Sequence, residues 1–384
     1  MPSSHDPKSS GNPVRVLMTS TSFPSTPGDW RGVFIRHLTE ALARRKDIHL
    51  RLWAPPGPCA GPVQRNSNAR ENMRLATLME QGGIAHLLRN QRVRGLIAAI
   101  RLLRDLYAAY RRDDVDLYHV NWLQCAIPVP SDGRPVVVTV LGSDMQFIRI
   151  PGMKALLRRA FRSRAVAICP NAGWMQTELE KSFGDIATIQ PVPFGIDPRW
   201  FEIDRGKSPA QPHEWLVVSR LTRAKLGPLL EWCAPLFARE SRELHLIGPM
   251  QENIHLPDWV RYHGPASPED LCNRWFPRAT GLITLSRHAE GRPQVILEAM
   301  AAGLPIIASR LPAHEGLVHD KHTGYIVDNP EQLALSVQRA ESHETTYRLG
   351  AQARKNVHET PGTWDDTAKH FCTIYRHLLE KSST

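Results

Sequence analysis

The sequence lacks close pairs of cysteine: its six cysteines are spread along the chain, at Cys59, Cys125, Cys169, Cys233, Cys272 and Cys372. This spacing excludes the disulfide framework of a small secreted domain and the ligand spacing of a zinc site. No apolar run reaches the about 18 residues that a membrane-spanning helix needs, and the polar first thirteen residues lack the apolar centre of a signal peptide. We therefore expect a cytoplasmic protein with reduced thiols, soluble or held at the inner face of the membrane.

The chain carries an excess of positive charge. It contains 48 Lys and Arg against 38 Asp and Glu, which gives a formal net charge of +10. Such an excess favours anionic partners, among them nucleotides, phosphorylated lipids and a membrane surface. Nothing in the sequence resembles a nucleic-acid-binding motif, so we expect no nucleic acid as a partner.

Apolar runs of strand length alternate with amphipathic helical stretches. The expected strands are 14–19, 48–54, 116–122, 135–141 and 165–169 in the first half, and 215–218, 244–247, 260–264, 281–285, 305–309 and 325–327 in the second. Strands that alternate with helices predict parallel sheets covered by helices on both faces. Because 384 residues are too many for a single core, we expect the α/β class with two similarly built domains.

Polar and proline-containing segments divide the chain. Residues 1–13 are expected to be disordered, and 206–213, which contain two prolines, are the best candidate for a linker. The N-terminal domain then spans 14–205, the C-terminal domain 214–362, and a last helix 363–384. Between two facing parallel-sheet domains, a ligand is expected in the cleft at the carboxyl ends of the strands.

The most informative segment is Ser286–Pro305, SRHAEGRPQVILEAMAAGLP. Seven residues separate Glu290, on the loop after an apolar strand, from Glu298, which lies more than a turn inside the following helix. Pro293 suits the first helical position, where its missing N–H is not needed, and the free amides of that turn favour a phosphate group. The Glu298 carboxylate can accept two hydrogen bonds from a ribose diol. The segment is therefore suited to a sugar nucleotide.

This segment resembles the E-x7-E signature of retaining glycosyltransferases with the GT-B fold, family 4 in particular. A preceding strand, Glu-Gly, and Leu-Glu-Ala-Met-Ala with Gly303 and Pro305 make the resemblance specific. It implies two Rossmann-like domains facing a central cleft: an N-terminal acceptor domain and a C-terminal donor domain, with the last helix crossing back to the first. It also implies that a hexosyl group passes from a nucleoside-diphosphate sugar to an acceptor hydroxyl with retained configuration, without a metal or other cofactor.

The resemblance assigns roles within the segment. Glu290, as a catalytic residue, and the main chain at Gly291 would orient the donor hexose, and Glu298 would bind the ribose. The diphosphate would lie against the chain at Arg292, Pro293, Gln294 and Val295.

Arg220 and Lys225 follow the first strand of the second domain, in VVSRLTRAKLG. Two cations five residues apart on a strand-end loop can converge on a diphosphate and neutralise the departing nucleotide. Family members carry Arg-Leu and a Lys at this spacing, although the glycine that usually follows the Lys directly is here Gly227, after Leu226. We predict that Arg220 and Lys225 are both catalytic.

The first domain offers three further candidates. Gly28 and Gly32 delimit a glycine-rich turn, which the resemblance places near the donor; a plain strand-to-helix turn is the alternative. His119 and Asn121 lie near a strand end, and relatives have a sugar-binding histidine in this region. His119 is thus a catalytic candidate or a core histidine, and Asn121 a cleft candidate. Asp144 stands where relatives read His-Gly-x-Asp, and can contact an acceptor or cap a turn.

Asp114-Val115-Asp116 matches the D-x-D metal motif of another glycosyltransferase fold, but it precedes a strand in the wrong place and we reject it. An arginine-rich helix is expected at 89–112. We expect its apolar stripe to cover the sheet and its arginines to face solvent or anionic lipid; the stripe consists of Leu96, Ile100, Leu103, Tyr107 and Tyr110.

The preferred function is therefore a hexosyltransferase of polysaccharide, glycolipid or small-glycoconjugate synthesis. The acceptor stays open between a lipid-linked saccharide, a growing polysaccharide and a small metabolite. A GT-B sugar-nucleotide epimerase and a non-catalytic sugar-nucleotide-binding partner subunit are the alternatives.

Overall fold

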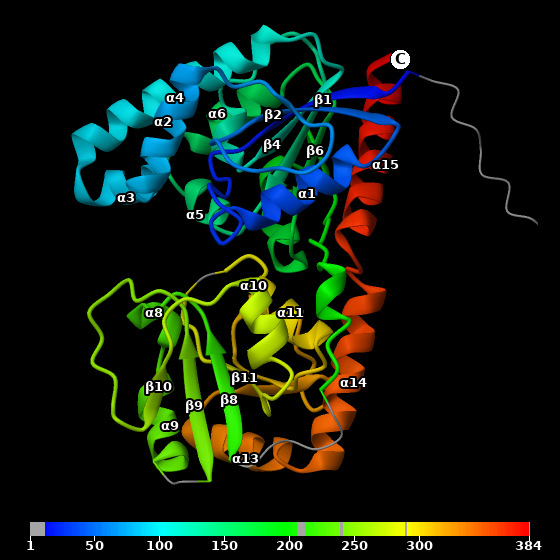
Figure 1. Ribbon diagram of the computed structural model, residues 1–384. Helices are drawn as coiled ribbons and strands as arrows, with labels where there is room; N and C mark the ends of the chain where they lie inside the picture. The colour runs from blue at the N-terminus through cyan, green and yellow to red at the C-terminus, as the bar shows by residue number, and fades with distance from the viewer. Residues whose placement is uncertain (1–11, 206–211, 239–240, 289, 384) are drawn as a thin grey trace, which may run out of the picture.

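The computed structural model describes residues 12–205, 212–238, 241–288 and 290–383 (Figure 1). Most of the expected disordered start, 1–13, and most of the expected linker, 206–213, lie outside these residues. The described chain forms two sheets whose pairings are all parallel.

The N-terminal sheet has seven strands in the order β3-β2-β1-β4-β5-β6-β7. Its central strands are continuous apolar runs buried on both faces, as a parallel sheet between helices requires. The two-residue edge strands β3 and β7 are too short to leave a sequence pattern. The strands are β1 Val14–Thr19, β2 Ile48–Trp53, β3 Gln64–Arg65, β4 Leu117–Asn121, β5 Val136–Val140, β6 Val166–Pro170 and β7 Thr188–Ile189.

The helices of this domain cover both faces of its sheet. They are α1 Val33–Ala43, α2 Ala69–Glu80, α3 Gly83–Asn90, α4 Arg92–Arg112, α5 Asp144–Phe147, α6 Met153–Phe161 and α7 Gln176–Phe183, with the short 3₁₀ turns η1 Leu123–Ala126, η2 Gly173–Met175 and η3 Pro198–Trp200.

The C-terminal sheet has six strands in the order β10-β9-β8-β11-β12-β13. The strands are β8 His213–Val218, β9 Arg242–Ile247, β10 Val260–Tyr262, β11 Gly281–Thr284, β12 Ile306–Ser309 and β13 Gly324–Val327. Its helices are α8 Arg223–Leu226, α9 Leu229–Phe237, α10 Pro268–Asp270, the π-helical η4 Leu271–Trp275, α11 Gln294–Ala301, α12 Pro312–Glu315, α13 Pro330–Ala340 and α14 His343–Glu359. The predicted fold class, two Rossmann-like parallel-sheet domains, is confirmed.

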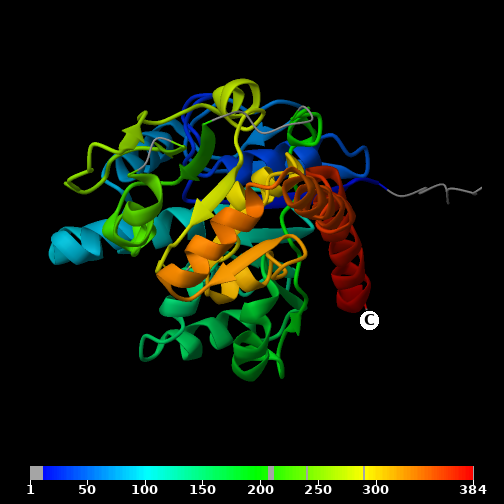
Figure 2. The ribbon, with the colours of Figure 1, turned by 90° about the horizontal axis from the view of Figure 1, so that it is seen from below.

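The last helix, α15 Trp364–Ser383, packs against α1 of the N-terminal domain. Its Phe371 and Tyr375 are fully buried in the core of that domain. Figures 1 and 2 show α15 along one side of the N-terminal domain and the α3 end projecting on the other.

The strand order reverses at equivalent places in both sheets, between β1 and β4 and between β8 and β11. At such a switch point the loops that follow the two strands diverge and leave a crevice for a ligand. In the C-terminal domain these loops carry Arg220 and Lys225 after β8 and Glu290 after β11. The topology therefore brings together residues that are 65 or more positions apart in the sequence.

The arginine-rich region differs from its prediction in two ways. It forms two helices, because the chain breaks at Gln91, between α3 and α4. The residues of α4 that face the core are Leu102, Leu106, Ala109 and Tyr110, whereas the predicted core residues Leu96, Ile100 and Tyr107 are 58%, 52% and 44% exposed. The helix has two adjacent apolar stripes. Of the predicted stripe, Tyr110 is buried and Leu103 is partly buried, and the rest of the buried face belongs to the neighbouring stripe.

Candidate functional site

An ion pair lies at the switch point of the C-terminal sheet. Lys225 Nζ is 2.5 Å from Glu290 Oε1, and both side chains are mostly buried, with 15% and 13% of their surface exposed. Ser286 Oγ donates a second hydrogen bond to the same carboxylate oxygen, at 3.2 Å. The structure thus joins two of the predicted catalytic residues and fixes the carboxylate with two donors.

Local chemistry explains the loop that presents Lys225. The Thr222 side chain accepts a hydrogen bond from the Lys225 amide and starts the short helix α8. Leu226 is buried in the core. Gly227 has φ +55°, and its Cα is so close to the residue after strand β11 that a Cβ would lie 2.0 Å from Leu285 O. Relative to the family pattern, Leu226 stands between the lysine and the glycine, and its side chain is packed in the core. Only glycine fits at position 227.

Arg220 contacts the glycine-rich turn of the other domain. Its guanidinium lies 5.3 Å from the centroid of the Trp30 ring, a cation–π distance. The turn is braced by Asp29, which pairs with Arg31 at 2.9 Å. Gly32 has φ +69°, and a Cβ there would lie 2.7 Å from Ser22, whereas Gly28 is exposed with open space around it. Gly32 thus serves the backbone of the turn, and Trp30 is the contact that the sequence argument missed.

Gly291 is a point of close contact between the two domains. A Cβ on Gly291 would lie 2.5 Å from Leu141 O and 2.9 Å from Asn171 Oδ1, and a Cβ on Gly142 would lie 2.5 Å from Gly291 N. Trp174 Nε1 donates a hydrogen bond to Gly291 O at 2.9 Å. The loop that carries Glu290 therefore packs against the segments that follow strands β5 and β6 of the N-terminal domain.

The amino end of α11 follows this contact directly. The helix begins at Gln294, and Pro293 stands one residue before it, with φ −68° and ψ 112°. The Gln294 side chain donates to Gly195 O at 3.3 Å, which ties the helix start to the segment between the domains. The predicted diphosphate segment, from Arg292 to partly buried Val295, thus lies beside the Lys225–Glu290 pair.

Glu298 lies in the second turn of α11, and its charge interacts with three residues that line a cavity, Asp197, Arg199 and Cys272. This cavity, of about 770 Å³, is lined by Asp197, Pro198, Arg199, Glu202, Ile203, Asp204, Glu269, Cys272, Asn273 and Pro277. Burial, and then the charge of Asp197, raise the pKa of Glu298 to about 7, with Arg199 acting in the opposite direction. Among the described residues, none donates a hydrogen bond to its carboxylate, so Glu298 is available to a ligand.

The structure corrects the prediction for His119, which is fully buried in the N-terminal core. Its Nδ1 lies 2.5 Å from Tyr375 Oη and its Nε2 2.7 Å from Thr139 Oγ1, so both ring nitrogens are occupied. Desolvation lowers its pKa to about 3. His119 joins α15 to the sheet and is a core histidine, not a sugar-binding residue.

Asp144 is likewise a structural residue, while Asn121 keeps a free acceptor. The two Asp144 oxygens accept hydrogen bonds from the amides of Leu123 and Leu141, each at 2.7 Å, so the acceptor contact predicted for Asp144 is replaced by a turn. Asn121 donates to Thr19 O at 3.0 Å, and its buried Oδ1 has no partner among the described residues.

Two histidines near the Lys225–Glu290 pair were not predicted from the sequence. Desolvation, and then the charge of Lys225, lower the pKa of His288. The charge of Glu290 raises this pKa, and the charge of Arg220 lowers it. His314 is fully buried near the same pair; its Nδ1 lies 2.8 Å from Ser309 O, and its Nε2 has no partner within the described chain. Both histidines follow ends of parallel strands, a signal that topology alone provides.

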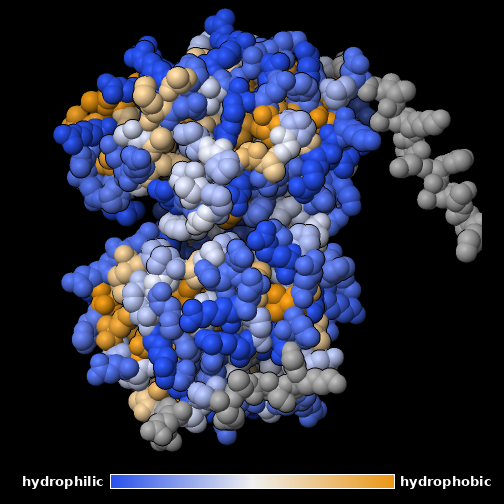
Figure 3. Space-filling view, in the orientation of Figure 1, coloured by the Kyte–Doolittle hydropathy of each residue, from blue (hydrophilic) through white to orange (hydrophobic). Residues whose placement is uncertain are grey.

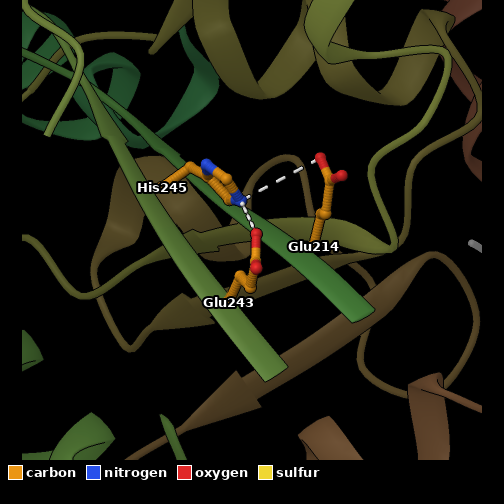
Figure 4. A group of neighbouring side chains, drawn as sticks. All are labelled: Glu214, Glu243 and His245. Atoms are coloured by element: carbon orange, nitrogen blue, oxygen red, sulfur yellow. Dashed lines mark hydrogen bonds and ion pairs between the residues drawn. The ribbon is translucent and has the colours of Figure 1, made fainter. Parts of the chain in front are cut away.

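A second polar group lies at the opposite end of the C-terminal sheet. Glu214, Glu243 and His245 point toward one another, with one possible metal-ligand atom each within 4.8 Å of the others (Figure 4). However, Arg278 pairs with Glu214 at 2.8 Å and Arg261 with Glu243 at 2.5 Å. These arginines neutralise the carboxylates, so the group has little net negative charge to attract a cation.

Two doubly wound parallel sheets meet across a furrow between the domains (Figure 3), and the last helix returns to the first domain. This arrangement is the GT-B fold. Residues 212–342 match the family described as glycosyl transferases group 1, which confirms the predicted resemblance for about a third of the chain.

Known proteins support the same assignment. The chain is 30% identical over 138 residues to spore coat protein SA of Bacillus subtilis, and 31% identical over 129 residues to D-inositol 3-phosphate glycosyltransferase of Streptomyces griseus. These matches cover 35% and 33% of this chain, and 35% and 26% of those relatives, so the chain spans about a third or less of their length.

Solved structures show the same fold over nearly the whole chain. Sucrose-phosphate synthase from Thermosynechococcus elongatus superposes with a TM-score of 0.69 at 17% identity, covering 96% of this chain and all of that one. Anabaena HepE in complex with UDP and glucose gives a TM-score of 0.64 at 13% identity, covering 95% and 100%.

Proposed function

We propose that this protein is a glycosyltransferase that moves a hexosyl group from a nucleoside-diphosphate sugar to an acceptor hydroxyl. The observation that carries the proposal is the Lys225–Glu290 pair, held at the switch point beside the start of α11 and within reach of Arg220. Cations and free helix amides together suit a diphosphate. The family match of residues 212–342 and the solved neighbour that binds UDP and glucose support it.

In the proposed site, Lys225 and Arg220 bind the diphosphate together with the amides at the start of α11. Glu298 binds the ribose hydroxyls, and the neighbouring cavity has room for the rest of the nucleoside. Glu290 and the main chain at Gly291 orient the hexose.

We further propose retention of configuration by front-face attack. The acceptor oxygen bonds to the anomeric carbon as the bond to the phosphate oxygen breaks, and the departing phosphate takes the acceptor's proton. We assign no side chain as a nucleophile, because the Glu290 carboxylate is bonded to Lys225 at 2.5 Å and to Ser286 Oγ at 3.2 Å. The negative charge that develops on the phosphate is met by Lys225 and Arg220, so the reaction needs no metal.

A donor screen tests the function. The protein is titrated calorimetrically with UDP-, GDP- and ADP-sugars, and release of nucleoside diphosphate is then followed with and without acceptor extracts, in the presence of a chelator. We expect one base to bind, release only with acceptor, and no loss of rate on chelation. Product anomers, assigned by NMR, test retention.

The alternatives give different results. An epimerase would convert the donor sugar without acceptor and without net release of nucleotide. A non-catalytic partner subunit would bind a sugar nucleotide and release nothing under any condition.

Glu298 predicts a pH dependence of donor binding. Its pKa of about 7 means that the carboxylate becomes protonated as the pH falls below 7, and a protonated carboxyl accepts fewer hydrogen bonds from a diol. We expect donor affinity to fall from pH 8 to pH 6 in the wild type. Glu298→Gln should weaken donor binding about tenfold and flatten this dependence. An unchanged donor KM would refute the ribose role.

We also propose that the α3–α4 hairpin contacts an anionic membrane, with a lipid-linked saccharide as acceptor. Residues 83–112 contain seven arginines and one acid, Asp105, which pairs with Arg74 at 2.6 Å. Exposed apolar side chains lie among these arginines, and Figure 3 shows apolar atoms at this end of the molecule; the most exposed are Val93 at 74%, Leu96 at 58% and Ile100 at 52%. Within the described residues, no helix is both long and apolar enough to cross a membrane.

Liposome flotation tests this surface. We expect binding to vesicles with anionic lipid at low salt, and little binding to neutral vesicles. Arg92→Gln with Arg94→Gln should weaken binding about tenfold or more, at about 1 kcal/mol per arginine near the surface, and Val93→Ser should weaken it further. Tyr347→Ser, 73% exposed on the other domain, is the matched control. Equal flotation of all variants would contradict the assignment.

A further inference from the structure

One arginine in the site has no partner among the residues that the structure describes. Five arginines in the described part of the chain have a buried Nε without a hydrogen-bond partner. Four of them bind elsewhere through their terminal nitrogens, to carbonyls or to an acid: Arg51, Arg164, Arg205 and Arg354. Arg292, the fifth, has no hydrogen bond, ion pair or ring contact with any described residue. Desolvation lowers its pKa to about 10, so it remains charged at neutral pH.

The position of Arg292 places this charge between the domains. It directly follows Gly291, which is seated on Leu141 and accepts the hydrogen bond of Trp174. It precedes the start of α11 by two residues. Lys225 and Arg220 come from the other strand-end loop, whereas Arg292 lies on the loop that contacts the N-terminal domain through Gly291.

The same contact holds hydrogen-bond acceptors without partners. Asn171 Oδ1, which lies against Gly291, and Gln294 Oε1 are buried and unpaired within the described chain. Unpaired buried polar atoms are uncommon in folded proteins, and with Arg292 Nε three of those in the described residues lie on or against the segment 291–294. A ligand with hydroxyls for the acceptors and an anion for the guanidinium would satisfy all three groups.

Taking most of a charged side chain out of water costs free energy when no protein group is bonded to its charge. Arg292 is partly buried, and its Nε is fully buried. If Arg292 only filled space, an apolar side chain of similar size would do so without this penalty. The charge has a use if the ligand supplies the missing negative oxygens, to which a guanidinium binds in a bidentate way.

We propose that Arg292 forms a subsite for a carboxylate or phosphate carried by the transferred sugar or by the acceptor, distinct from the donor diphosphate. The inference rests on the proposed function, since it assigns an anionic substrate to that site. A uronic acid donor and a phosphorylated acceptor are the two sources of the same chemistry.

Pairs of substrates that differ only in one anionic group distinguish a charged donor sugar from a charged acceptor. Wild type and Arg292→Gln are compared with glucose and glucuronic acid donors on the base found in the donor screen, and with neutral and phosphorylated forms of one acceptor. We expect kcat/KM for the charged member of one pair to fall about 10- to 100-fold more in the variant than kcat/KM for its neutral counterpart, with Arg292→Lys partly active. Equal use of charged and neutral substrates, or weaker binding of free nucleoside diphosphate, would overturn the subsite.

Thermal melting tests the unpaired charge without any substrate. Arg292→Gln and Arg292→Met should melt at the wild-type temperature or above. Arg354→Gln is the contrast, because Arg354 donates to Ile203 O at 2.7 Å and Ala302 O at 3.0 Å and should lower the melting temperature when replaced. A clear loss of stability in both Arg292 variants would show that Arg292 is a structural residue. If no sugar nucleotide binds, the proposed function fails, and this measurement still stands.

Discussion

Replacing Lys225 by alanine should lower kcat/KM for the donor about 100- to 1,000-fold, the usual effect of removing one group that stabilises developing charge. Lys225 is the cation bonded to Glu290, at 2.5 Å. Its loss removes positive charge from the departing diphosphate and leaves the Glu290 carboxylate, 13% exposed, without its counterion. Steady-state kinetics and calorimetry with free nucleoside diphosphate measure both effects.

The control for this variant is Lys355→Ala, an exposed lysine on α14 whose pair with Glu359 spans 4.0 Å. Such exposed pairs contribute little, so this variant should keep wild-type kinetics. Wild-type kinetics for Lys225→Ala itself would remove Lys225 from the site. A melting curve for each variant separates lost chemistry from lost folding.

Replacing Gly291 by alanine should lower kcat/KM about 10- to 100-fold while both domains stay folded. The added Cβ would lie 2.5 Å from Leu141 O, a distance that real Cβ atoms do not reach. The domains must then separate by part of an ångström or the Glu290 loop must shift, at a cost of about 1–3 kcal/mol. Because Glu290 and Arg292 flank this residue, either response displaces the site.

Gly173→Ala is the matched control, because Gly173 neighbours Trp174 in the same contact region and a Cβ added there would have no atom within 4 Å. We expect normal kinetics for this variant. Small-angle scattering of Gly291→Ala should report a slightly more open particle than the wild type. Unchanged kinetics for Gly291→Ala would show that the close domain contact is not part of the active arrangement.

Much of the fold follows from local pattern. The strand Val14–Thr19 has the predicted bounds, and most others differ by one or two residues. Parallel strands buried on both faces are continuous apolar runs, which a sequence displays directly. The pairing of Lys225 with Glu290 was not predicted, because it depends on β8 and β11 being neighbours in the sheet, and only the structure shows that strand order.

Side-chain partners were harder to predict than strands. His119 and Asn171 both stand at or near strand ends of the N-terminal sheet, and nothing local distinguishes them. Tyr375, 256 residues away, occupies one nitrogen of His119, whereas Asn171 lies against Gly291 of the other domain. Which polar residue faces a ligand is thus decided by a helix and a loop remote in sequence.

The amino-acid sequence by itself determined the two parallel sheets, their order of elements and the acidic pair of the Glu290–Glu298 segment, because periodicity and spacing are local properties of the chain. Only the tertiary structure decided which charges are neutralised, leaving Arg292 unpaired among the described residues while Arg354 binds two carbonyls. It also decided which stripe of α4 is exposed. The reason is that neutralisation and burial depend on contacts between segments far apart in the sequence, and periodicity carries no record of those contacts.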